Sequence, residues 1–165
     1  MKTAFGLVDG YLKKLYGDVT PKLRWAYVDF LLDHRLNPDD NFRTTLPDLD
    51  DLVFAKTQGL TVFDIPNAVP EPKDKFPCTY SAPVEAYTPE FKKHLLERLD
   101  AVVPELEKLG LIDKAYVYGF DECGPEYGPV IKDLFGEVKR RYPKIHTCST
   151  FRLPAGTDPV SLNID

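Results

Sequence analysis

The 165-residue sequence has little that would attach it to a nucleic acid or to a membrane. Its formal net charge is −5, and its longest basic run, Lys139–Arg141, fits the last turn of a helix, where cations suit the helix dipole. Without a basic patch to neutralise phosphates, nucleic-acid binding is not expected. No apolar run reaches the roughly 20 residues that cross a bilayer, and residues 1–10 lack the apolar segment of a signal peptide. We therefore expect no nucleic-acid and no membrane partner, and a secreted or periplasmic location only if a signal lies upstream of this chain.

Patterns for metal ions and disulfides are also missing. The cysteines are three, Cys78, Cys123 and Cys148, and we expect them to be free thiols. No cluster of histidine, cysteine and carboxylate residues has metal-ligand spacing, so neither a metal nor a cofactor is predicted. Cys123 stands beside two acidic residues, but without an evident histidine partner it is expected to be a small packing residue rather than a nucleophile.

What is present is enough apolar sequence for a core and a regular alternation of elements. A length of 165 residues suits one domain or part of a larger one, and at 43% hydrophobic the chain can bury a core. Two Thr-Pro pairs, at 20–21 and 88–89, have the form of an N-cap followed by proline at the first helical position. The pattern predicts helices near 21–34, 49–59, 88–109 and 129–142, and strands at 3–7, 60–65, 115–120, 144–151 and 159–165. Apolar strands joined by helices predict a parallel sheet covered on both faces, with a Pro-rich loop at 66–87.

The segment 116–129, YVYGFDECGPEYGP, holds the feature with the clearest chemistry. A buried strand ends in two adjacent carboxylates, Asp121 and Glu122, and the carboxyl ends of parallel strands are where ligands bind. Neighbouring strand residues point to opposite faces, so the chain must turn for both to serve one site, and the following Cys-Gly-Pro is such a turn. A protonated acid beside an ionised one is the pairing that cleaves a glycosidic bond.

Other polar residues fall near predicted strand ends or beside the acidic pair, where they could bind a substrate. Capping of a helix or loop is the competing role for most of them, and for Arg35 it is holding a loop carboxylate such as Asp39. A tyrosine hydroxyl near the pair could reach an acetamido group. The candidate substrate-binding residues are Arg35, Asp64, Asn67, Tyr127, Asn163 and Asp165.

Several of these segments resemble one enzyme family. YVYGFDE (116–122) resembles the catalytic strand of glycoside hydrolase family 123, the β-N-acetylgalactosaminidases and their relatives, and FLLDHRLNPDD (30–40) resembles that family's first barrel helix and the loop after it. TAFG (3–6) and VSLNID (160–165) resemble two of its strands. The resemblance spans nearly the whole chain and implies a (β/α)8 TIM-type barrel. A full barrel needs about eight strands; the chain is therefore expected to be one partial barrel domain over 1–165, with about the first five strands, and the rest of the barrel is a candidate partner.

The resemblance also implies a mechanism. The 2-acetamido carbonyl of a terminal β-linked N-acetylhexosamine, with N-acetylgalactosamine favoured, attacks the anomeric carbon, and the configuration is retained. Asp121 would orient the acetamido group, and Glu122 would act first as general acid and then as general base. Two alternatives stay open: a non-catalytic barrel fragment or carbohydrate-binding remnant, and an unrelated α/β protein whose acidic pair binds a divalent metal.

Overall fold

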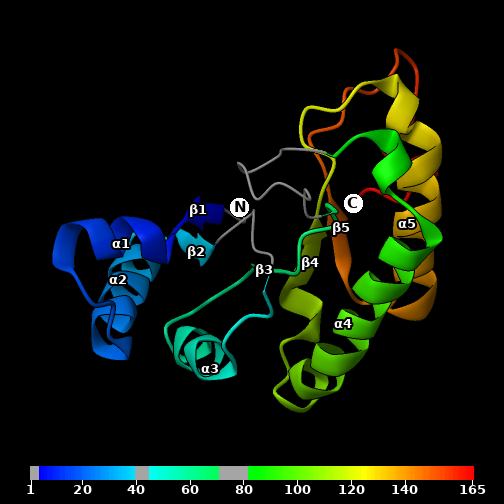
Figure 1. The fold of residues 1–165 in the computed structure, drawn as a ribbon. Coiled ribbons are helices and arrows are strands. Elements are labelled where there is room, and N and C mark those ends of the chain that lie inside the picture. The colour runs from blue at the N-terminus through cyan, green and yellow to red at the C-terminus, as the bar shows by residue number, and fades with distance from the viewer. Residues whose placement is uncertain (1–3, 40–44, 71–81) are drawn as a thin grey trace.

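The computed structural model describes residues 4–39, 45–70 and 82–165, in which helices and short strands alternate (Figure 1). The α-helices in these residues are α1 (Asp9–Tyr16), α2 (Pro21–Asp33), α3 (Leu49–Thr57), α4 (Pro89–Lys108) and α5 (Gly128–Arg141). The strands are β1 (Ala4–Gly6), β2 (Asn37–Asp39), β3 (Phe63–Ile65), β4 (Ala115–Tyr118) and β5 (His146–Cys148). The protein is therefore mixed α/β.

Both predicted Thr-Pro helix starts are confirmed. The hydroxyl of Thr20 accepts a hydrogen bond from the backbone N–H of Leu23, and the hydroxyl of Thr88 accepts one from Phe91, each at 3.2 Å. These side chains satisfy donors that the first helical turn leaves unpaired. The helices predicted near 21–34, 49–59, 88–109 and 129–142 correspond to α2, α3, α4 and α5.

The strands form two small parallel sheets, one of β1 and β2 and one in the order β3-β4-β5. The prediction of a partial (β/α)8 barrel is therefore wrong, because the described strands make no continuous wall. Pro38, in the middle of β2, provides the physical reason. Leu7 donates its N–H to the carbonyl of Asp39, so the backbone groups of Asp39 point toward β1. Because these groups alternate along a strand, those of Pro38 point away from β1, toward β3. Proline has no N–H to donate, so a backbone ladder from β2 to β3 is interrupted.

Side chains bridge the two sheets instead. The Oδ1 atom of Asn37 accepts the backbone N–H of Thr61 at 2.7 Å, and the carboxylate of Asp39 accepts that of Asp64 at 3.0 Å. Because Asn37 meets Thr61 and Asp39 meets Asp64, β2 and β3 run in the same direction. The two sheets are thus linked by buried polar side chains rather than by backbone pairs.

Two further predictions need correction, and two elements were not predicted. Residues 159–165 are not a strand: Pro159–Leu162 form a 3-10 helix. The residues after it contact β5 through Thr147, whose hydroxyl donates to the carbonyl of Asn163 and whose carbonyl accepts the N–H of Asp165. Helix α1 and strand β2 were not predicted at all. Of the loop predicted at 66–87, residues 71–81 lie outside the described residues, and Val84–Ala86 form a 3-10 turn.

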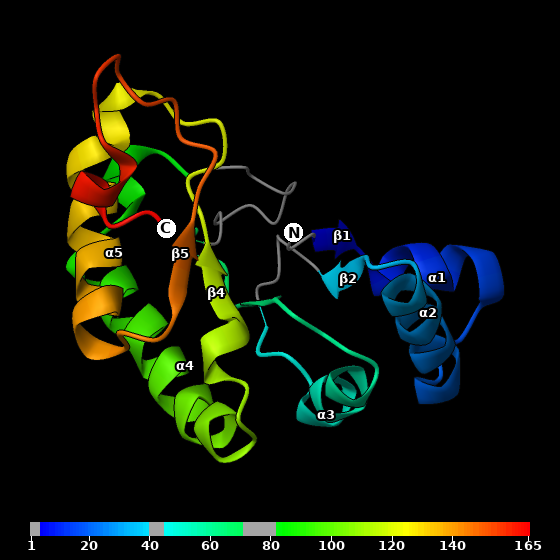
Figure 2. The ribbon, with the colours of Figure 1, turned by 180° about the vertical axis from the view of Figure 1, so that it is seen from behind.

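Helices α4 and α5 pack together against one face of the three-stranded sheet, whereas α1 and α2 lie with β1 and β2 at the other end of the molecule (Figures 1 and 2). The core between the sheet and its helices includes fully buried Ile65, Val117, Leu99 and Ile131. Side chains alternate along a strand, so Asp64 on β3 and Tyr116 and Tyr118 on β4 share the opposite face. That face carries the candidate site.

Candidate functional site

The acidic pair follows β4 in a tightly turned segment. Phe120 has φ 58° and Glu122 has φ 51°, both in the left-handed region that L-residues seldom adopt. The turn predicted at Cys-Gly-Pro is therefore made earlier, within the acidic segment itself. Each such residue costs on the order of 1–3 kcal/mol unless its surroundings hold it in place.

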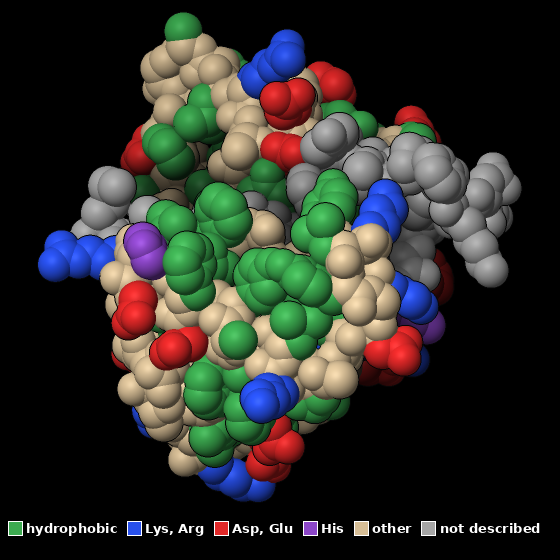
Figure 3. Space-filling view, turned by 90° about the vertical axis from the view of Figure 1, so that its left-hand side faces the viewer, with side chains coloured by type: hydrophobic (Ala, Val, Ile, Leu, Met, Phe, Trp, Pro, Cys, Tyr) green, Lys and Arg blue, Asp and Glu red, His purple; other side chains and the backbone are tan. Residues whose placement is uncertain are grey.

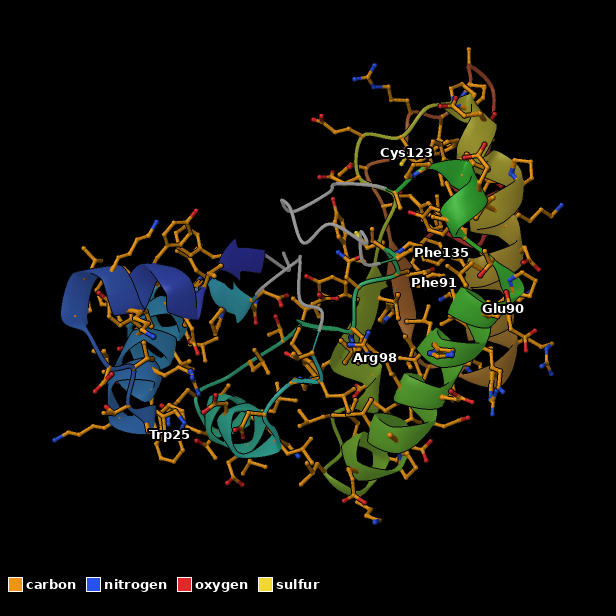
Figure 4. The ribbon with its side chains drawn as sticks, in the orientation of Figure 1. Trp25, Glu90, Phe91, Arg98, Cys123 and Phe135 are labelled. Atoms are coloured by element: carbon orange, nitrogen blue, oxygen red, sulfur yellow. The ribbon has the colours of Figure 1, made fainter. Side chains whose placement is uncertain are left out.

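Aromatic packing holds this turn. The side chain of Phe120 is fully buried, with its ring 4.8 Å from that of Tyr87 and 5.4 Å from that of Phe135. The hydroxyl of Ser149 donates a hydrogen bond of 3.0 Å to the carbonyl of Phe120. Figure 4 labels Phe135 on α5 and Cys123, which directly follows the acidic pair. The bent end of β4 is thus anchored in the core.

Two hydroxyl groups fix the carboxylate of Asp121. Its Oδ1 atom accepts a hydrogen bond of 2.7 Å from Tyr118 and another from the hydroxyl of Thr150. Burial and the neighbouring charge of Asp121 raise the pKa of Tyr118, although its contact with Thr150 acts in the other direction. Tyr118 therefore keeps its proton and acts as a donor to Asp121.

Thr150 also connects the two acids. Its hydroxyl oxygen accepts the backbone N–H of Glu122 at 2.9 Å. The side chain of Glu122 is exposed, whereas Asp121 is half-buried. Neither acid forms an ion pair within the described residues. The carboxylate of Asp121 is held in place, whereas that of Glu122 faces solvent. Such a difference in environment can give two neighbouring acids different roles in catalysis.

Asp64 and Asn67 are brought to the same end of the sheet. Asp64 is fully buried and lies beside Tyr116, and Asn67 is also buried. The next residue, Ala68, donates its N–H to the carbonyl of Tyr118 at 2.7 Å. Gly119 permits this approach, because a Cβ there would lie 3.0 Å from the Cβ of Ala68.

A buried polar group lies below the acidic pair on this face. Tyr116 donates its hydroxyl to the Oδ2 atom of Asp39 at 2.5 Å, and both residues are largely buried. Burial, together with the negative charges of Asp39 and Asp64, raises the pKa of Tyr116. The hydroxyl therefore stays protonated and ties β4 to β2.

The other predicted substrate residues do not join this group. The hydroxyl of Tyr127 donates to the carbonyl of Ala82 at 3.0 Å, and its ring contacts that of Phe120. The amide of Asn163 donates to the carbonyl of Lys132 on α5. Arg35 precedes β2, at the amino end of that strand, whereas the acidic pair follows the carboxyl end of β4.

Asp165 pairs with α5 and β5. Its Oδ2 atom accepts a hydrogen bond of 2.8 Å from the N–H of Thr147 and pairs with the ammonium group of Lys139. Burial acts to raise the pKa of Asp165, but the bonds from Lys139 and Thr147 outweigh it and lower that pKa. These contacts give Asp165 a structural role at the edge of β5.

Sequence reasoning missed the supports of the pair. Tyr118 and Thr150 were taken only as parts of predicted strands, yet both bond to Asp121. Asp39 was read as a loop residue, because Asn-Pro-Asp is a weak strand signal. Alternation along β4 could have pointed to Tyr118, since it lies on the same face as Tyr116.

The described residues contain neither a metal-binding cluster nor a membrane-spanning helix. Among them, no group of three or more histidine, cysteine or acidic residues could hold a metal ion. No described helix combines the length and apolar character that crossing a bilayer would require. A cavity of about 420 Å³ lies among α1, α2, α3 and β2, and its described lining does not include the acidic pair.

No protein-family model matches the chain, and no curated protein matches it significantly. The assignment to glycoside hydrolase family 123 therefore stays a prediction that rests on the sequence motifs.

Proposed function

We propose that the protein is a glycoside hydrolase that releases terminal β-linked N-acetylhexosamine, with N-acetylgalactosamine as the favoured sugar. The observation that carries the proposal is the contrast between the two neighbouring acids. Asp121 is fixed by Tyr118 and Thr150, and Glu122 is exposed on a strained turn. A substrate-assisted mechanism gives its two acids different roles, and unlike environments are what separate such roles.

The role of Asp121 follows from its hydrogen bonds. Both hydroxyl donors bond to Oδ1, so Oδ2 keeps its capacity to accept a further bond, as far as the described residues go. The N–H of a 2-acetamido group would donate to Oδ2, and the carboxylate would stabilise the positive charge that develops as the acetamido oxygen attacks the anomeric carbon. Holding the acetamido group near that carbon supplies proximity, whose effective molarity can reach about 10⁵ M or more.

Glu122 supplies the proton. In the first step its carboxylic acid protonates the leaving oxygen, the glycosidic bond breaks, and the acetamido oxygen bonds to the anomeric carbon. In the second step the carboxylate takes a proton from water, which opens the oxazolinium ring and gives a product with the original β configuration. General acid catalysis of this kind contributes on the order of 10²–10⁴-fold in rate.

Hydrolysis of a 4-nitrophenyl N-acetyl-β-D-galactosaminide tests the proposal. We expect release of nitrophenol, a β-anomer as the first product by NMR, and little activity on the corresponding galactoside, which has a 2-hydroxyl in place of the acetamido group. Glu122→Gln should lower kcat by about 10²–10⁴-fold. Glu126→Gln is the matched control, since it changes an exposed glutamate four residues away and should leave the rate unchanged.

Three results would contradict the proposal. Unchanged hydrolysis in the Glu122→Gln variant would exclude Glu122 as the proton donor. Equal rates on the galactosaminide and the galactoside would exclude assistance by the acetamido group. Binding of N-acetylgalactosamine without hydrolysis would favour the alternative of a non-catalytic carbohydrate-binding protein.

A further inference from the structure

The outer face of α2 is apolar, with Ala26 and Phe30 exposed and Leu23 and Tyr27 half-buried. Residues 23, 26, 27 and 30 recur at helical spacing and line one side of the helix: Leu23, Ala26, Tyr27 and Phe30. Phe30 is 59% exposed, and Tyr16 of α1, which is 55% exposed, extends this surface through a hydroxyl–hydroxyl bond of 2.6 Å to Tyr27. We call these five residues the α2 face. Figure 3 looks onto the side of the molecule that α1 and α2 form, where hydrophobic side chains gather.

The inner side of α2, which packs against the rest of the molecule, is apolar as well. Val28 and Leu31 are buried there, and the ring of Trp25 stacks on that of Phe54 in α3 at 4.7 Å. A helix that is apolar on both sides is normally covered on both sides. Exposed apolar clusters of this kind mark interaction surfaces more often than chance.

Charges along one edge of the α2 face suggest what covers it. Lys22, Asp29 and Asp33 are spaced by seven and four residues, so they share one edge of the helix. No ion pair within the described residues involves any of the three. The cation lies at the amino end and the acids toward the carboxyl end, which opposes the helix dipole. Of the described α-helices, α2 alone lacks both an acidic first turn and a basic last turn.

We propose that the α2 face packs against the α2 face of a second copy of this chain, with the two helices antiparallel about a two-fold axis. The stripe is centred between Ala26 and Tyr27. An antiparallel pair therefore places Leu23 of each copy opposite Phe30 of the other, and the small Ala26 lets the helices approach.

The charged edges match in the same arrangement. A two-fold axis sets identical edges side by side in opposite directions. Position 22 then lies opposite position 31 of the second copy, within two residues, or about 3 Å along the axis, of both acids. Lys22 of each copy would thus pair with Asp29 and Asp33 of the other. The dimer places a partner beside charges that oppose the dipole of their own helix.

Sedimentation equilibrium over a wide range of protein concentration tests the proposal. We expect a reversible monomer–dimer equilibrium. Phe30→Asp should weaken association by about a hundredfold or more, because the substitution occurs twice in a two-fold interface and buries a charge in its centre. The control is Val160→Asp, which changes an apolar residue that is 71% exposed outside the α2 face and should leave the equilibrium unchanged.

Charge reversal tests the antiparallel arrangement. Lys22→Asp and Asp33→Lys should each weaken the dimer about tenfold, and the double variant should recover most of the loss, because the pairs are re-formed with opposite signs. Circular dichroism should show that each variant is folded; if Phe30→Asp is not, Ala26→Glu replaces it. A monomer at all concentrations, a dimer unaffected by substitution on the α2 face, larger aggregates, or a double variant as weak as the single variants would overturn the proposal.

Discussion

The two ends of the molecule differ in how much apolar surface each of them buries. Around β3, β4 and β5, large side chains from α4, α5 and the strands are fully buried, including Leu99, Phe120, Phe135 and Val138. Around α1 and α2, few apolar side chains are buried, and Tyr11, Leu15, Tyr16 and Phe30 are more than half exposed.

Polar contacts add to the attachment of α2, whose apolar contacts are few. The guanidinium group of Arg24 pairs with Asp9 and Asp51, and the indole N–H of Trp25 donates to Asp51 at 2.6 Å. Burial of apolar surface stabilises a region more strongly than exposed or half-exposed ion pairs do. The candidate site therefore sits on the stable end of the molecule, where its strained turn can be held.

Truncating matched phenylalanines on the two ends should show this difference most clearly. Phe135→Ala removes a fully buried ring and should lower the free energy of unfolding by about 3–5 kcal/mol, through lost burial and the cavity left behind. Phe30→Ala, on the α2 face, should lower it by no more than about 0.5 kcal/mol in the monomer. Urea denaturation at low protein concentration measures both, and equal losses would refute the comparison.

The bridge between the sheets should be intermediate in strength. Asn37 is buried, and Asn37→Ala removes the acceptor that the part-buried N–H groups of Thr61 and Val62 share. We expect a loss of about 1–3 kcal/mol in unfolding free energy. Asn37→Asp keeps an acceptor oxygen in the same place and should recover part of that loss. Hydrogen exchange at Thr61 and Val62 should rise in the alanine variant, and unchanged protection would show that the bridge does not hold them.

Thr150 should matter for catalysis more than for folding, because its side chain is exposed. Thr150→Val removes the donor to Asp121 and the acceptor for the N–H of Glu122. If the proposed hydrolysis is correct, kcat should fall about tenfold, equivalent to about 1.4 kcal/mol. Thr150→Ser keeps the hydroxyl and should restore most of the rate. A serine variant as slow as the valine variant would indicate that the methyl group, not the hydroxyl, is required.

Substitution of Asp165 should have the smallest effect on the free energy of unfolding, and this effect should depend on pH. Its folded-state pKa is lowered, so the ionised carboxylate adds stability above the ordinary aspartate pKa of about 3.9, and this is lost as pH falls through the lower folded value. Asp165→Asn should cost a few tenths to about 1 kcal/mol near neutral pH, since the pair is partly exposed. In urea denaturation the difference from the parent should disappear in acid; a constant difference at all pH values would exclude the charge as its cause.

Much of the fold was predictable wherever local signals were strong. The Thr-Pro starts at Thr20 and Thr88 define α2 and α4, because capping and the fixed φ of proline act on the nearest turn of backbone. The strand that ends near the acidic pair was also predicted. Strand β2 was not, because its pairing with β1 depends on residues more than 30 positions away and its proline weakens any local strand signal.

By itself, the sequence determined helices α2, α3, α4 and α5, the buried strand before Asp121 and Glu122, and the adjacency of those two acids, all of which depend on neighbouring residues. Only the tertiary structure decided that Phe120 and Glu122 adopt left-handed backbone conformations, that Thr150 bonds to both acids, and that Asn163 and Asp165 turn to α5 and β5. The physical reason is that backbone strain persists only where packing over long sequence distances holds it. No local pattern specifies which distant side chain will occupy that place.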